Sequence, residues 1–98
     1  MTRTIWKFLL EVKDGIQIVK MPSVSNVISV DMIGMKVSLW AIVDPDSIEV
    51  DRRFVVYGTG EAMHENLFIS YIGTCIQRSD FNMKPWIWHV FEVLKKEE

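Results

Sequence analysis

The chain has 98 residues, a net charge of −2, and a composition that is 49% hydrophobic and 24% charged. A chain of this length builds one core, so we expect a single β domain over residues 1–98 with a disordered tail at 95–98. The absence of a basic excess argues against duplex nucleic acid as a partner. No apolar stretch reaches the roughly 18–20 residues that cross a bilayer, so we predict no membrane partner.

The first strand is predicted from the alternation of apolar and polar side chains along the chain. Over residues 4–12 apolar side chains alternate with polar ones, which is the period of a half-buried strand. Asp14-Gly15 is a two-residue turn signal and predicts a hairpin with a return strand over 16–21. Pro22 then ends the return strand, because proline cannot donate to a ladder.

The rest of the chain also indicates strands. The segment 36–43 is apolar on both alternating faces, which predicts a central strand covered on both sides. Segments 60–66 and 90–96 each allow a short helical turn. The remaining strands are expected at 27–33, 53–57, 68–77 and 86–94. We therefore predict an all-β fold, a single small antiparallel β-sandwich or barrel of about seven strands with at most one short helix.

Two similar motifs, Tyr57-Gly58-Thr59-Gly60 and Tyr71-Ile72-Gly73-Thr74, stand where apolar runs break. Glycine lets a ligand approach the main chain, and a threonine hydroxyl can donate to a phosphate. Two such corners side by side would cradle an anion through main-chain N–H groups. Ordinary turn chemistry accounts for the same residues, since glycine supplies positive φ, and both interpretations stay open.

Arg53 alternates onto the same side as Tyr57 and is the candidate partner for a phosphate or carboxylate. The alternative is that Arg52 and Arg53 pair with the acidic residues that precede them. Those residues are Asp44, Asp46, Glu49 and Asp51. They lack the glycine and the terminal glutamate of a calcium loop, so we predict no metal there.

His89 shares a face with Ile87 and Phe91, whereas Glu92 falls on the other face. A histidine in this position can contact a ligand, or it can simply be hydrogen-bonded. An enzyme that uses Cys75 with His89 as its base is the least favoured reading, because a lone cysteine in an apolar strand is usually a small buried hydrophobe. We predict no enzyme activity, no cofactor and no metal.

The aromatic content exceeds what so small a core needs, with four Trp, five Phe and two Tyr. Trp6, Trp40, Trp86 and Trp88 are not all expected to be buried. Exposed aromatic rings suit stacking on bases or anchoring a protein interface, and buried ones stabilise a sheet across its strands.

Further motifs occur in order along the chain: Trp6-Lys7-Phe8, Met21-Pro22, Leu39-Trp40-Ala41-Ile42-Val43-Asp44-Pro45, Arg53-Phe54 and Trp88-His89-Val90-Phe91-Glu92. Together with the two Gly-Thr motifs they resemble a family of small tailed-bacteriophage proteins, a domain family of unknown function. The resemblance implies a phage accessory protein in the cytoplasm of the infected bacterial host. It implies no catalytic residue, and the single cysteine fits a reducing cytoplasm.

By analogy with small phage proteins, this resemblance makes a non-enzymatic counter-defence factor the leading hypothesis, one that sequesters a small, anionic, nucleotide-derived immune signal. The predicted ligand-binding residues are Arg53, Tyr57, Gly58, Thr59, Tyr71, Gly73, Thr74, Trp88 and His89. We expect a homo-oligomer, because so small a chain has little concave surface of its own. The alternatives are a protein that inhibits a host defence complex through an exposed aromatic and acidic face, or a minor virion or assembly protein.

Overall fold

The computed structural model describes residues 2–79 and 82–96. These residues form strands and loops without a helix, which confirms the all-β prediction. No segment among them is a helix that could cross a membrane. The seven strands are β1 (Thr4–Leu10), β2 (Gln17–Pro22), β3 (Ser25–Ile33), β4 (Lys36–Val43), β5 (Glu49–Gly58), β6 (Leu67–Ser79) and β7 (Asn82–Lys96).

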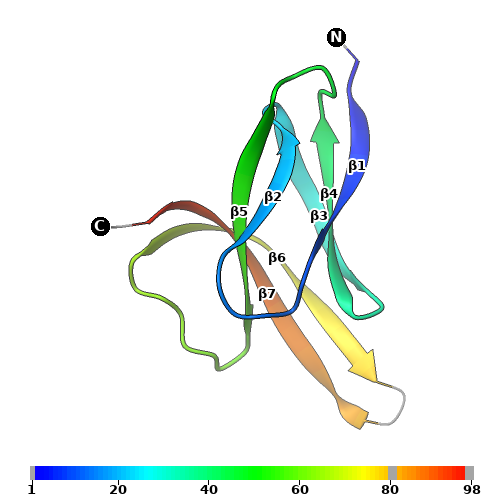
Figure 1. Cartoon of the computed structure of the whole chain (residues 1–98). Coiled ribbons are helices and arrows are strands. Elements are labelled where there is room, and N and C mark those ends of the chain that lie inside the picture. The colour runs from blue at the N-terminus through cyan, green and yellow to red at the C-terminus, as the bar shows by residue number, and fades with distance from the viewer. Residues whose placement is uncertain (1, 80–81, 97–98) are drawn as a thin grey trace.

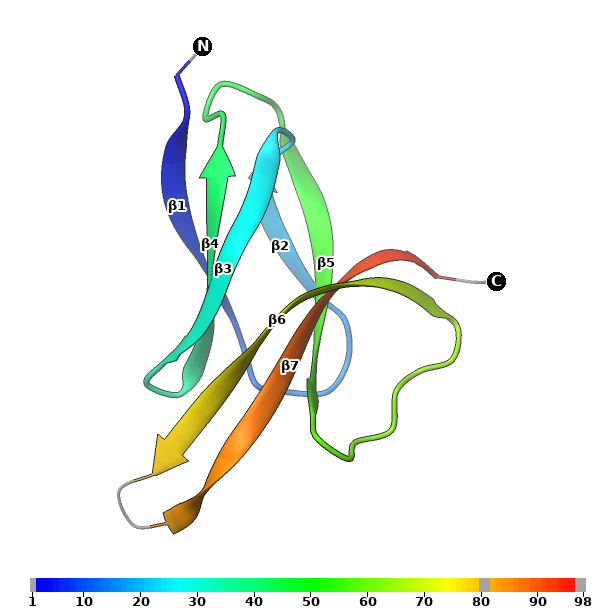
Figure 2. The same ribbon diagram turned by 180° about the vertical axis from the view of Figure 1, so that it is seen from behind.

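The strands form two antiparallel sheets, with the order β1-β4-β3 in one and β2-β5-β7-β6 in the other. The two sheets pack against each other as a sandwich, which Figures 1 and 2 show from opposite sides. Both sheets contribute to the core between them, Leu39 from the smaller sheet and Phe54 and Val90 from the larger. Burying one such side chain stabilises the fold by about 1.5–3 kcal/mol.

Strand β4 matches its prediction at both ends and lies in the middle of its sheet, between β1 and β3. Its alternate residues Val37, Leu39, Ala41 and Val43 are fully buried against the larger sheet. On the other face, Trp40 and Ile42 are only half-buried. The apolar residues on that second face therefore pack beside their neighbours in the sheet, without the full cover that the sequence suggested.

The hairpin predicted at Asp14-Gly15 is wrong. Strand β1 pairs with β4 and strand β2 pairs with β5, so the two strands belong to different sheets. The side chain of Gln17 bridges the connection between β1 and β2. Its Oε1 accepts from the Glu11 N–H (2.8 Å), and its Nε2 donates to the Glu11 carbonyl (2.7 Å). The turn signal is local, whereas the burial of each strand's apolar face selects its sheet.

The β6–β7 hairpin is the longest element, with strands of 13 and 15 residues. One end of it projects beyond the neighbouring strands, as Figures 1 and 2 show. Segment 60–66 is a loop and segment 90–96 is strand, so neither forms the short helical turn that the sequence allows. Strand β7 also includes the first two residues of the expected tail, and residues 97–98 lie outside the described residues.

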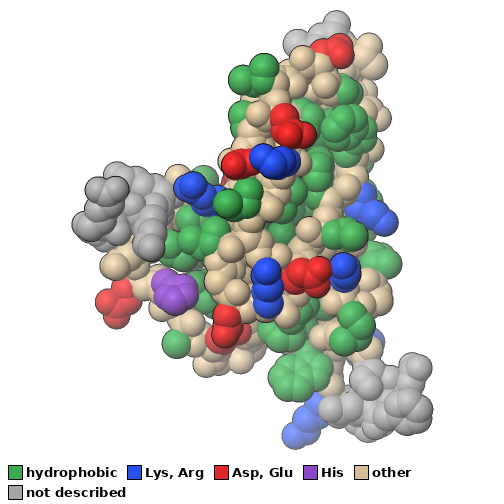
Figure 3. All heavy atoms as spheres, in the orientation of Figure 1, with side chains coloured by type: hydrophobic (Ala, Val, Ile, Leu, Met, Phe, Trp, Pro, Cys, Tyr) green, Lys and Arg blue, Asp and Glu red, His purple; other side chains and the backbone are tan. Residues whose placement is uncertain are grey.

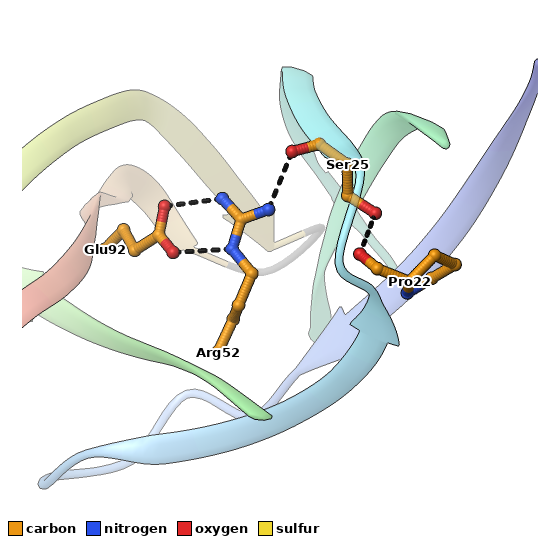
Figure 4. Close-up of polar contacts among 4 residues, drawn as sticks. All are labelled: Pro22, Ser25, Arg52 and Glu92. Carbon is orange, nitrogen blue, oxygen red and sulfur yellow. Dashed lines mark hydrogen bonds and ion pairs between the residues drawn. The ribbon is translucent and has the colours of Figure 1, made fainter. Parts of the chain in front are cut away.

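Arg52 links the two sheets of the sandwich (Figure 4). Arg52 on β5 donates from Nε and from one terminal nitrogen to the two oxygens of Glu92 on β7, at 2.6 Å each. Its other terminal nitrogen donates to the Ser25 carbonyl of β3, in the opposite sheet, at 2.8 Å. The side chains of Arg52 and Glu92 are only 20% and 16% exposed. The fork geometry of the guanidinium thus joins three strands from both sheets.

Candidate functional site

The pairing register of β5, β7 and β6 places the predicted site residues on both faces of the larger sheet. Tyr57 lies opposite His89, which lies opposite Thr74, and all three face away from the sandwich. Gly58 lies opposite Trp88, and this pair belongs to the face that packs on the smaller sheet. The outward face carries Arg53, Tyr57, Thr59, Tyr71, Thr74 and His89, and the inward face carries Gly58, Gly73 and Trp88.

Four of the outward residues, Thr59, Tyr71, Thr74 and His89, form one hydrogen-bonded chain, here called the His89 cluster. The His89 ring lies between two hydroxyls, with Nε2 2.8 Å from Thr59 Oγ1 and Nδ1 3.0 Å from Thr74 Oγ1. The Tyr71 hydroxyl lies 2.6 Å from Thr74 Oγ1. Because a neutral imidazole donates from one nitrogen and accepts at the other, the chain can run in either direction. It presents exposed hydroxyls that can bind a polar group.

Tyr57 and Arg53 do not join the His89 cluster. Tyr57 is only 6% exposed, and its ring packs edge-on against Phe91. Its hydroxyl accepts a long hydrogen bond from the His64 N–H, at 3.4 Å. Arg53 is exposed on the same face as Tyr57, as alternation predicts, but lies about 13 Å farther along the strand. The structure therefore separates the predicted charge partner from the predicted hydroxyl groups.

The first Gly-Thr motif already has partners for its main-chain groups. The Gly58 N–H donates to Glu61 Oε1 at 2.9 Å, and the Thr59 N–H donates to the Ile87 carbonyl at 3.3 Å. Glu61 N–H in turn donates to the Gly58 carbonyl at 3.0 Å. A carboxylate of the chain itself thus occupies the position beside Gly58 at which a bound phosphate was expected.

The second Gly-Thr motif is not a corner. Gly73 and Thr74 lie within β6, next to an irregularity of register between Tyr71 and Gly73. A Cβ on Gly73 would lie 2.4 Å from Cγ1 of Val30, which belongs to β3 in the opposite sheet. Glycine is needed at position 73 because the two sheets approach closely there.

Next to the first motif the surface is hollowed. The chain leaves the sheet after Gly58, and segments 58–61 and 85–88 line a hollow of about 450 Å³, here called the Trp86 notch. The rings of Trp86 and Trp88 stack along it, nearly parallel at 13° and with centroids 6.2 Å apart. Trp88 is fixed by a hydrogen bond from its Nε1 to Gln77 Oε1 (3.0 Å), whereas Trp86 is 59% exposed.

Many other large apolar side chains are exposed on both sheets. On the face of the molecule that Figure 3 shows, apolar side chains lie between small groups of charges. Ile5 and Leu9 lie exposed on β1, at the edge of the smaller sheet. Tyr71, 60% exposed, and Ile76 lie on β6, at the edge of the larger sheet. The tryptophans follow the expectation that not all are buried, since Trp6 and Trp86 are exposed.

Cys75 and His89 cannot act as a nucleophile and its base in this structure. Cys75 lies opposite Trp88 and is buried in the core, on the other face of the sheet from His89. Burial raises the pKa of the Cys75 thiol, and the negative charge of Asp31 raises it further. A raised pKa keeps the thiol protonated and unreactive.

Two of the acidic residues before Arg52, Asp44 and Asp51, have partners other than the arginines. Asp44 is buried, and its carboxylate accepts from the Asp46 N–H at 3.0 Å, within the turn that follows β4. Asp51 pairs with Lys20 across the strands at 3.0 Å. Within residues 2–79 and 82–96, no three His, Cys, Asp or Glu side chains gather closely enough to hold one ion.

Sequence reasoning did not assign Trp86 or Glu61 to the candidate site, and it did not predict Glu92 as the partner of Arg52. Trp86 shares a face with Trp88 by alternation, so that signal was present in the sequence. Glu61 lies in an irregular loop, and no periodic pattern shows that it folds back onto Gly58. The Arg52–Glu92 contact joins residues 40 apart in the chain, which no local pattern indicates.

Fold and surface define a small antiparallel β-sandwich with an exposed aromatic hairpin. The chain belongs to the family described as Domain of unknown function (DUF7352), whose sequence model matches residues 1–98. The expectation of an uncharacterised domain family is therefore confirmed over the whole chain. Comparisons with curated proteins and with solved structures found no match.

Proposed function

We propose that this protein is a non-enzymatic binding protein of a tailed phage that occupies a surface of a host defence protein in the infected cell. The observation that carries the proposal is the Trp86 notch, where an exposed indole stands beside a carboxylate held on the main chain. Partly exposed Trp side chains are enriched among the residues that anchor protein interfaces. The exposed apolar side chains on both sheets support the same proposal.

Charge favours this function over capture of a nucleotide at the first Gly-Thr motif. The Glu61 carboxylate would repel a phosphate placed beside Gly58, and it already accepts the N–H that the phosphate needs. The same carboxylate suits a basic group on a partner protein. The aromatic and acidic face expected of a protein-binding inhibitor is thus the arrangement that the notch offers.

A second candidate function is supported by the His89 cluster. Thr59 and Tyr71 carry exposed hydroxyls at the two ends of a single hydrogen-bonded chain, which is a means of holding a small polar ligand. Exposed Tyr71 could stack on a base, and Arg53 on the same face of the sheet, two strands away on β5, could meet a phosphate. This arrangement supports sequestration of an extended nucleotide signal.

The first test compares what the tagged full-length protein retains from infected, defence-active cells. We expect one host protein to be retained in stoichiometric amount by the wild type and by Trp6→Ala, and to be lost with Trp86→Ala. Trp6→Ala is the matched control, because Trp6 is also an exposed tryptophan but lies on β1. Equal retention by Trp86→Ala and the wild type would contradict the proposal.

The same preparation distinguishes the second candidate. After denaturation, mass spectrometry of the released small molecules would detect a captured nucleotide. Sequestration predicts a nucleotide that is lost with His89→Gln and with Arg53→Ala, whereas the protein-binding function predicts little effect of either change on the retained host protein. Release of a nucleotide with no retained protein would favour the second candidate over the first.

A further inference from the structure

The Trp86 notch combines two features that select one chemical group. Its aromatic part is rigid on one side, because Trp88 packs on the core and is hydrogen-bonded to Gln77. Trp86 continues the stack toward solvent with its ring nearly parallel to that of Trp88. A planar group that enters the notch can therefore extend a stack that already exists, at little cost in ordering the protein.

The charged part of the notch is a single carboxylate. Glu61 is the only charged residue in segments 58–61 and 85–88. Its Oε1 is held by the Gly58 N–H, and its Oε2 makes no hydrogen bond with any described residue. The carboxylate and the Trp88 ring both lie close to Gly58, since a Cβ there would be 3.5 Å from Glu61 Oε1 and 3.1 Å from the ring. The notch thus places a fixed negative charge beside an aromatic stack.

We propose that the Trp86 notch binds a guanidinium group, the side chain of an arginine on the partner protein. A guanidinium is planar, stacks on indole faces and donates hydrogen bonds to a carboxylate. An ammonium group has the charge that complements Glu61, but it has no planar face to stack on the indole rings. A nucleotide base can stack on the indole rings, but the negative charge of its phosphate would be repelled by Glu61. The inference rests on the proposed protein-binding function and names the contact chemistry of the partner.

The test uses the ¹⁵N-labelled full-length chain and small probes, so it does not depend on identifying the partner. The indole N–H signals of Trp86 and Trp88 are followed by NMR while N-acetyl-arginine amide is added. N-acetyl-citrulline amide is the matched control, because it has the same shape and no charge. We expect saturable shifts of both signals with arginine, and affinity for citrulline that is lower by about five- to tenfold.

Two variants assign the effect to the notch. Trp86→Ala should abolish the response, and Glu61→Gln should lower the arginine affinity to that of citrulline while its amide oxygen still accepts from Gly58 N–H. Trp6→Ala should respond as the wild type does. Equal binding of arginine and citrulline, a stronger response to adenosine monophosphate, or an unchanged arginine preference in Glu61→Gln would overturn the inference.

The two proposals can fail separately. If a correctly folded chain gives no response to arginine but still retains a host protein through Trp86, the guanidinium assignment is wrong and the protein-binding function stands. If arginine binds in the notch but no host protein is retained, the guanidinium-binding site is confirmed and the proposed protein-binding function is contradicted.

Discussion

The guanidinium of Arg52 donates two hydrogen bonds of 2.6 Å to the carboxylate of Glu92 and a third of 2.8 Å to the Ser25 carbonyl of the opposite sheet. Glu92 and His89 lie on opposite faces of β7, so the same strand supplies the ionic partner of Arg52 on one face and part of the His89 cluster on the other. Stability and the candidate polar site are therefore separable by substitution.

Arg52→Ala should lower the free energy of unfolding by about 2–3 kcal/mol, because it leaves the half-buried Glu92 carboxylate and the Ser25 carbonyl without their partner. Urea unfolding measures the loss. Lys20→Ala is the control, since the Lys20–Asp51 pair is exposed and should contribute almost nothing. A loss from Arg52→Ala as small as that from Lys20→Ala would contradict the role assigned to this ion pair.

Gly73→Ala should destabilise the protein by about 1–3 kcal/mol, because the added methyl group would overlap Val30 and force the sheets apart. Removing the obstacle should relieve the effect, so the double variant with Val30→Ala should be more stable than the sum of the two single losses predicts. Thermal unfolding of all four proteins gives this comparison. Strictly additive losses would show that the contact between β3 and β6 is not the reason for the glycine.

Cys75 should make stability fall at alkaline pH. Its pKa is raised in the folded state by burial first and by Asp31 second, so above pH 9.0, the thiol's ordinary value, the unfolded chain loses the proton more readily than the folded one. The contribution is therefore fully present below that pH and is lost as pH rises through the folded-state pKa. Urea unfolding between pH 8 and 10.5 should show a steeper decline for the wild type than for Cys75→Ala. Parallel curves for the two proteins would contradict the prediction.

Strand β1 should mediate association of the chain with itself. It is an edge strand with one exposed row of backbone groups, and its outward side chains Ile5 and Leu9 are 57% and 49% exposed. We expect a dimer or larger assembly by light scattering at micromolar concentration, and a monomer for the double variant Ile5→Lys and Leu9→Lys. Ile48→Lys is the control, because Ile48 is exposed in the loop between β4 and β5. A monomeric wild type would rule out the expected homo-oligomer under these conditions.

The candidate site was predicted only in part. Alternation correctly separated His89 from Glu92 and placed Arg53 on the side of Tyr57, because side chains of a strand point to alternate faces. It did not place Thr59, Thr74 and His89 within hydrogen-bonding distance, because they come from the β5 end, β6 and β7 and meet only through strand pairing. Whether either surface binds a ligand stays a prediction.

The sequence by itself determined which segments are strands, because a period of two acts within a few neighbouring residues. Proline was a weaker guide, since Pro85 lies within β7. Strand β4 matches its expected bounds, and β2 ends at Pro22. Only the tertiary structure decided which strands pair, why position 73 is glycine, and that Glu61 fills the place beside Gly58. Each of these features depends on residues that are distant in sequence and that meet because apolar surface is buried between the two sheets. A local sequence pattern does not predict which distant residues make contact.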